Sequence, residues 1–170
     1  MISLRSQPHI PPTCFNGNSM QNPFRTAIVA ASLLCCLSVT AQEKGMWRAA
    51  SSTAKSITGD IALSDEKITI NFSTFTMVRV RALEKAELSA AFDADGAKGS
   101  GSLYRLIVPA STKFLRKNTL CGSEETEWMA TYVMGRSLKV DFFSGQKPPL
   151  FTLEALANSS DLCGTYSYVN

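Results

Sequence analysis

The sequence has almost no histidine, and this scarcity excludes several classes of catalytic and metal site. The only histidine of the 170 residues is His9, which lies in a segment that we expect to be removed. A mature chain without histidine has no Ser-His or Cys-His nucleophile pair, no histidine general base and few ways to hold zinc. We therefore expect no cofactor, no metal and no enzymatic activity.

A strong charge of either sign and a membrane-spanning run are also missing. The formal net charge is +3, and it falls to +1 once Arg5 and Arg25 are removed with the N-terminal segment. This balance is not that of a nucleic-acid-binding protein. The uncharged apolar run at residues 27–39 is shorter than the roughly 20 residues that a transmembrane helix needs. The sequence thus predicts neither a nucleic-acid partner nor a permanent membrane anchor.

The same apolar run is typical of a bacterial secretory signal. Arg25 precedes it, and Val39 and Ala41 place small side chains at the positions that signal peptidase inspects. We therefore predict cleavage between Ala41 and Gln42, and a mature protein in the periplasm or the medium.

The residues before this run have no helical or strand period. A second methionine, Met20, follows them, so translation begins at Met1 or at Met20. The predicted organisation is an N-terminal extension at residues 1–19, a signal peptide at 20–41 and a single β domain at 42–170.

Two of the five cysteines, Cys121 and Cys163, follow the predicted cleavage site. An exported chain meets an oxidising compartment, where two remaining thiols have one pairing available. We predict a disulfide between them, and we expect it to tie the last strand to the loop before Trp128.

Most of the mature chain alternates between apolar and polar residues, as strands with one wet face do. Residues 57–63 and 68–72 show this period on either side of a polar turn, and predict a hairpin. Residues 48–51 are the candidate for a first strand. Further strands are predicted at residues 76–83, 87–93, 102–108, 127–134, 137–143, 150–155 and 165–169.

These roughly eight to ten short strands predict an all-β fold, a small antiparallel β-barrel or a barrel-like sandwich. One helical alternative remains at residues 80–92, which include a series of good helix formers.

Arg79 and Arg81 are weak candidates for binding. On a regular strand they share one face, and Val78 and Val80 lie on the other. If the valines face the core, which is the favoured interpretation, the arginines are merely solvated. If the strand instead lines a barrel lumen, the two guanidinium groups are suited to a carboxylate or another anion.

Tyr166 and Tyr168 are the other weak candidates. Most of the aromatic residues are expected to fill the core, and these two, on one face of the last predicted strand, are the expected exceptions at a recognition surface.

Two acidic segments can be interpreted either as solvated turns or as functional sites. Glu124, Glu125 and Glu127 supply carboxylates that could run a glycosidase, but a solvated turn is the favoured interpretation. Asp93 to Gly96 resembles the middle of a calcium loop, yet Ala91 and Ser102 occupy its two obligatory carboxylate positions. A hairpin turn is the better account.

A resemblance follows from Gly45-Met46-Trp47 and the run of short strands after it. This opening resembles that of calycin-type barrels, the lipocalin and avidin class. The wider arrangement, with residues 56–61 near its start and residues 162–166 at its end, is similar to small exported bacterial β proteins. The resemblance implies a barrel but no activity. The lipocalin Thr-Asp-Tyr pattern is absent and the mature chain is short for that family, which argues against a deep cavity.

Three functions fit these observations. The first is a non-catalytic binding module that holds a small apolar or anionic ligand, or a protein partner, at a barrel mouth. The second is an envelope accessory or structural protein without a small ligand. The third is an enzyme that relies on carboxylates or on a Ser-Lys pair.

Overall fold

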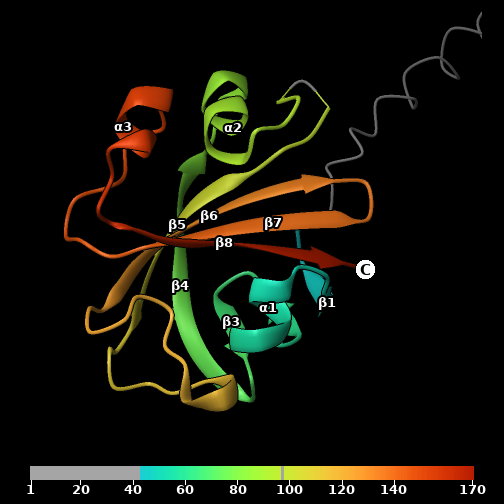
Figure 1. The fold of residues 1–170 in the computed structure, drawn as a ribbon. Coiled ribbons are helices and arrows are strands. Elements are labelled where there is room, and N and C mark those ends of the chain that lie inside the picture. Colours follow the sequence, from blue (N-terminus) through green and yellow to red (C-terminus); the bar gives the residue numbers. More distant parts are fainter. Residues whose placement is uncertain (1–42, 97) are drawn as a thin grey trace, which may run out of the picture. The chain divides into compact units, whose positions relative to one another are not determined.

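The computed structural model describes residues 43–96 and 98–170, whose strands close into a barrel (Figure 1). The predicted extension, signal peptide and Ala41–Gln42 cleavage site lie outside the described residues. The antiparallel strands follow one another around the barrel in sequence order: β1 (Gly45–Ala49), β2 (Ile61–Leu63), β3 (Lys67–Ile70), β4 (Ser73–Ala82), β5 (Ser102–Val108), β6 (Thr126–Met134), β7 (Ser137–Phe143) and β8 (Leu162–Val169). The predicted all-β barrel is confirmed.

Strand β1 closes the barrel by pairing with two neighbours in turn. Its first half pairs with β2, as Trp47 does with Ile61. Its second half pairs with β8, where Ala49 lies opposite Tyr168. The predicted first hairpin is present as β2 and β3, and closure leaves no long unpaired edge.

Four short helical elements connect the strands. They are α1 (Ser52–Ile57), α2 (Lys85–Phe92), η3 (Leu115–Lys117) and α3 (Leu153–Ala157). Within the described part of the chain, none of the helices has the length and apolar character needed to cross a bilayer.

Two predicted strands are wrong because helix caps decide the local structure. The segment at residues 87–93 is helix α2, where the backbone N–H of Glu84 donates a 2.9 Å hydrogen bond to the Glu87 carboxylate. The segment at residues 150–155 leads into α3, where the Thr152 hydroxyl accepts from the Ala155 N–H. The helical alternative at residues 80–92 was right from Lys85 onward, while β4 continues to Ala82.

The first predicted hairpin also begins too early, because residues 52–57 form α1. The hydroxyl of Ser51 accepts a hydrogen bond of 3.1 Å from the Ala54 N–H and starts this helix. Helix α1 and the η3 turn lie together at the end of the barrel where β5 finishes. The side-chain amide of Asn118, which follows η3, donates a hydrogen bond to the Ser56 carbonyl of α1.

Aromatic side chains fill the interior of the barrel. Trp47, Phe142, Tyr166 and Tyr168 are each at most 1% exposed. Burial raises the pKa of Tyr166 to about 12, and the Tyr168 hydroxyl lies 2.8 Å from the hydroxyl of Thr58. The prediction that these two tyrosines face a recognition surface is therefore wrong, because the pattern of the last strand does not show which face is inside.

A second apolar layer lies outside the barrel, where α2 and α3 lie over β5, β6 and β7 (Figure 1). Leu88 and Phe92 of α2 are buried against Leu103 and Tyr132, and the Phe92 and Tyr132 rings stack with centroids 5.7 Å apart. This layer fixes the position of α2, which forms one wall of the pocket described below.

The predicted disulfide joins Cys121 and Cys163, whose α-carbons are 4.9 Å apart. Cys121 lies in the connection before β6 and Cys163 lies in β8. The bridge therefore ties the last strand to the long β5–β6 connection, as expected from the compartment argument.

Candidate ligand-binding site

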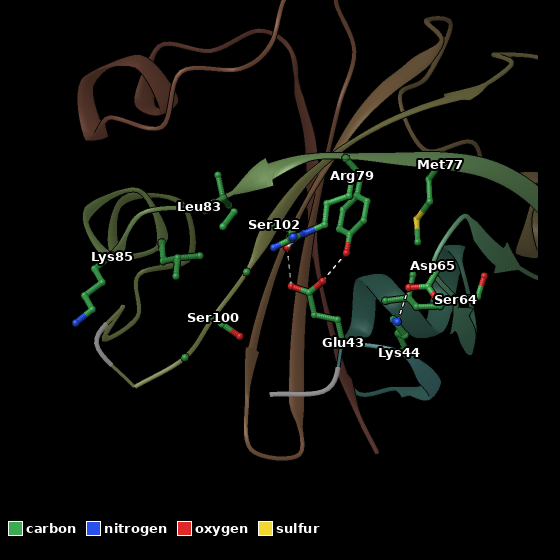
Figure 2. A pocket seen from close by; sticks show the side chains of 16 residues that line it. Glu43, Lys44, Ser64, Asp65, Met77, Arg79, Leu83, Lys85, Ser100 and Ser102 are labelled. Atoms are coloured by element: carbon green, nitrogen blue, oxygen red, sulfur yellow. Dashed lines mark hydrogen bonds and ion pairs between the residues drawn. The ribbon is translucent and has the colours of Figure 1, made fainter. Parts of the chain in front are cut away.

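A pocket of about 810 Å³ opens at the end of the barrel where β4 ends and β5 begins (Figure 2). The segment before β1, the β2–β3 turn, α2 and the start of β5 surround it. Its apolar walls are Leu63, Met77, Leu83 and Leu88, and its polar groups include Glu43, Lys44, Asp65, Arg79, Lys85, Ser102 and Tyr104.

The carboxylate of Glu43 occupies the polar side of this pocket. The Tyr104 hydroxyl donates to its Oε2 over 2.5 Å, and the Ser102 hydroxyl donates to its Oε1 over 3.1 Å. The Thr131 hydroxyl lies 3.2 Å from the same Oε1. Hydroxyl groups from two neighbouring strands, β5 and β6, thus converge on one carboxylate, an arrangement that strengthens each bond through the charge on the acceptor.

Strand geometry brings these hydroxyls together. Ser102 and Tyr104 are two residues apart on β5 and so point to the same face. The Ser102 N–H also donates to the Thr131 hydroxyl oxygen over 3.0 Å. Arg79 on β4 completes the arrangement, because its Nε donates to Ser102 Oγ over 2.9 Å and leaves the Ser102 proton free to point at Glu43.

The backbone of Glu43 is held as well as its side chain. The indole N–H of Trp47 donates to the Glu43 carbonyl oxygen over 2.9 Å. The segment entering β1 is therefore fixed across the pocket at two points.

The pocket lining carries three cations, Lys44, Arg79 and Lys85, and two carboxylates, Glu43 and Asp65. Lys44 pairs with Asp65 across the mouth, whereas Arg79 and Lys85 form no ion pair within the described residues. Burial raises the pKa of Tyr104 well above its usual range, and the hydrogen bond to Glu43 acts in the same direction. The phenol consequently stays protonated and remains a donor.

Arg79 and Arg81 do not share a face, because the register of β4 against β5 shifts between them. Arg79 lines the pocket, while Arg81 forms a two-pronged ion pair with Glu87 of α2 at 2.6 and 2.7 Å. Val78 and Val80 are 62% and 50% exposed. The valine core of the favoured interpretation is therefore wrong, although both arginines are exposed as it expected, and the lumen alternative describes Arg79 only.

The other predicted candidates lie away from the pocket. Glu124 and Glu125 are exposed before β6, and Glu127 pairs with Arg105 on β5. Asp93 adopts a left-handed conformation and ends α2 rather than turning a hairpin. Among the described residues, no three acidic or sulfur side chains gather closely enough to hold a metal ion.

Arg79 is the one pocket residue that was a candidate from the sequence; Glu43, Ser102 and Tyr104 were not predicted to bind a ligand. The available signal was the alternation of Ser102 and Tyr104 on a strand whose direction was not fixed. Glu43 offered no signal, because it belongs to no strand and its partners are distant in the sequence.

Comparison with protein-family models, with curated proteins and with solved structures finds no match to this chain. The similarity of Gly45-Met46-Trp47 to calycin-type openings stays a prediction. In the structure Gly45 begins β1 and Trp47 points into the barrel.

Proposed function

We propose that this protein is a non-catalytic binding module that holds a small amphipathic molecule, with a carboxylate head group, at the barrel mouth. The observation that carries the proposal is the seating of the Glu43 carboxylate on the hydroxyls of Tyr104 and Ser102. The chain's own carboxylate in this position supports a ligand with the same head group.

The rest of the pocket suits the remainder of such a molecule. A volume of about 810 Å³ falls within the usual range of ligand sites, roughly 300 to 1,000 Å³. Leu63, Met77 and Leu88 provide an apolar wall opposite the polar groups. Arg79 and Lys85 add positive charge at the entrance, which favours an anion over a neutral or cationic ligand.

The ligand carboxylate is proposed to take the place of Glu43. After this exchange the hydroxyl groups of Ser102 and Tyr104 still donate hydrogen bonds to a carboxylate, so no buried donor is left without an acceptor. Glu43 then moves into solvent, where water replaces its partners.

Isothermal titration with decanoate tests the proposal, and decanol, which has the same chain without the carboxylate, is the control ligand. The two arginines that flank the register shift provide matched variants. Arg79→Gln should weaken decanoate binding about tenfold through loss of a charged donor, whereas Arg81→Gln, whose side chain pairs outside the pocket, should not. Absence of decanoate binding, or equal binding of decanol, would refute the proposed function.

We also propose that the domain works outside the cytoplasm of a bacterium, in the periplasm or after secretion. The disulfide supports this, since such bonds persist in oxidising compartments. N-terminal sequencing of protein recovered from the periplasm should begin at Gln42, and an intact Met1 or Met20 would contradict it.

An envelope accessory protein without a small ligand is the second candidate. The aromatic filling of the barrel interior favours it, because Trp47, Phe142 and Tyr166 occupy space that many ligand-binding barrels keep open. The decanoate titration separates the two functions.

A further inference from the structure

Two neighbouring turns at the end of the barrel opposite the pocket display an aromatic side chain and several cations. The turn between β3 and β4 consists of Asn71 and Phe72, and the second turn runs from Lys113 through η3 (Figure 1). Contact between the rings of Phe75 and Phe114, with centroids 6.1 Å apart, joins the two turns. We call Phe72, Lys113, Arg116 and Lys117 the basic tip.

The backbone of the basic tip is strained where its side chains are most exposed. Phe72, Arg116 and Lys117 have φ angles of 68°, 55° and 63°, in the left-handed region that bulky residues rarely adopt. Asn71 and Phe72 form a two-residue hairpin turn with both φ angles positive, a position where Asn-Gly is strongly preferred. A phenylalanine in the second place therefore opposes the local backbone preference.

Packing in the core does not offset this strain, because the Phe72 side chain is 98% exposed. The adjacent Asn71 and Ser73 are polar, so Phe72 protrudes from a hydrophilic surface. Backbone strain at a residue that makes no stabilising contact is typical of functional positions.

The cations of the basic tip also form no ion pairs with the described residues. Lys113, Arg116 and Lys117 are exposed, and none of them enters an ion pair with a carboxylate of the described residues. Glu124 and Glu125 belong to the same β5–β6 connection but follow Cys121, immediately before β6.

We propose that the basic tip docks on an anionic membrane surface. One protruding phenyl ring, on a hairpin that contacts a turn with three exposed cations, matches the boundary between acyl chains and phosphate groups. A protein partner would require a broad complementary face with an apolar centre, whereas the surroundings of Phe72 are polar. The proposal is independent of the ligand pocket and concerns attachment of the described domain to a membrane surface.

Sedimentation with lipid vesicles tests this proposal, using protein purified from cells that produce the full chain. Vesicles of phosphatidylcholine with one quarter phosphatidylglycerol should bind the protein at low salt, and vesicles of phosphatidylcholine alone should bind it weakly. Binding should fall as the salt concentration rises, since the cations act at the surface. A wild-type protein that ignores anionic vesicles, or binds both kinds equally, would overturn the proposal.

Phe72→Gly separates docking from folding, because glycine suits the turn better than phenylalanine does. We expect about tenfold weaker vesicle binding, from loss of the buried ring, and an unchanged or raised melting temperature. Phe72→Asn should act in the same way, and Arg116→Gln with Lys117→Gln should remove the preference for anionic lipid. Leu153→Ala is the matched control, since Leu153 is an exposed apolar residue on α3, outside the basic tip. Vesicle binding that survives both Phe72 variants, or is lost equally in the Leu153 variant, would contradict the role of Phe72.

Discussion

The hydroxyl of Tyr104 donates a 2.5 Å hydrogen bond to Oε2 of Glu43, a residue that precedes it by 61 positions. This bond links the segment entering β1 with β5 across the mouth of the barrel. Because the acceptor belongs to the segment before β1 and the donor to the barrel wall, the pair can separate without unfolding either strand.

Removal of the Glu43 carboxylate should increase the affinity for decanoate. The wild-type chain holds its own carboxylate on the hydroxyls, so a ligand must compete with it, and this competition lowers the apparent affinity. Glu43→Ala is expected to bind decanoate about tenfold more tightly, as measured by titration calorimetry. Glu124→Ala, which removes an exposed carboxylate outside the pocket, should leave the affinity unchanged. Weaker binding by Glu43→Ala would show that Glu43 helps the ligand instead.

Loss of the Tyr104 hydroxyl should have the opposite effect. Tyr104→Phe keeps the ring but leaves the ligand carboxylate with one donor fewer, so decanoate binding should weaken about tenfold. The effect should persist when Glu43 is also alanine, because the hydroxyl then serves only the ligand. Decanol binding should not change, and an equal loss for both ligands would point to a general disturbance of the pocket.

Particular residues show why the sequence predicted the barrel better than the site. The bounds of β5 and β7 were predicted correctly because residues 102–108 and 137–143 alternate clearly and end in turn residues. The segments 87–93 and 150–155 are apolar but short, and in such runs strand and helix patterns overlap. Hydrogen bonds made by Glu84 and Thr152 decide in favour of helix.

The site depends on three-dimensional relationships that a strand pattern does not contain. On a regular strand Arg79 and Arg81 would lie on one face. The register of β4 against β5 shifts between them, so Arg79 lines the pocket and Arg81 points outward. Glu43 meets Ser102 and Thr131 only because the barrel closes. The disulfide could be predicted without geometry, because only two of the five cysteines follow the expected cleavage site.

Breaking the disulfide should destabilise the domain by about 2 to 5 kcal/mol. Cys163→Ser should lower the urea midpoint of unfolding and first release the segment around β8, since the bridge is its tie to the β5–β6 connection. Cys121→Ser and the double variant should show the same loss, because all three remove one bond. Labelling of the denatured, unreduced wild-type protein should find neither Cys121 nor Cys163 reactive, and labelling of both would refute the bridge.

Asp141 gives the domain a pH-dependent stability. It lies on β7, opposite Thr165 of β8, and is only 1% exposed. Burial raises its pKa to about 7, although Thr165 and the charge of Lys139 act in the opposite direction. A carboxyl group whose pKa is higher in the folded state binds its proton more tightly there, so ionisation favours unfolding.

The contribution of Asp141 to stability should therefore be complete below about pH 4, the ordinary range of an aspartate, and should be lost as the pH rises to about 7. Asp141→Asn keeps the shape without the charge. We expect this variant to exceed the wild type in unfolding free energy at pH 8, by an amount on the order of a few kcal/mol, and to show little advantage at pH 4. Urea unfolding of both proteins at several pH values measures the difference directly, and Glu125→Gln, which changes an exposed carboxylate, should leave the wild-type pH dependence intact. Parallel curves for Asp141→Asn and the wild type would show that the pKa of Asp141 is the same in the folded and unfolded states, and would contradict this role of burial.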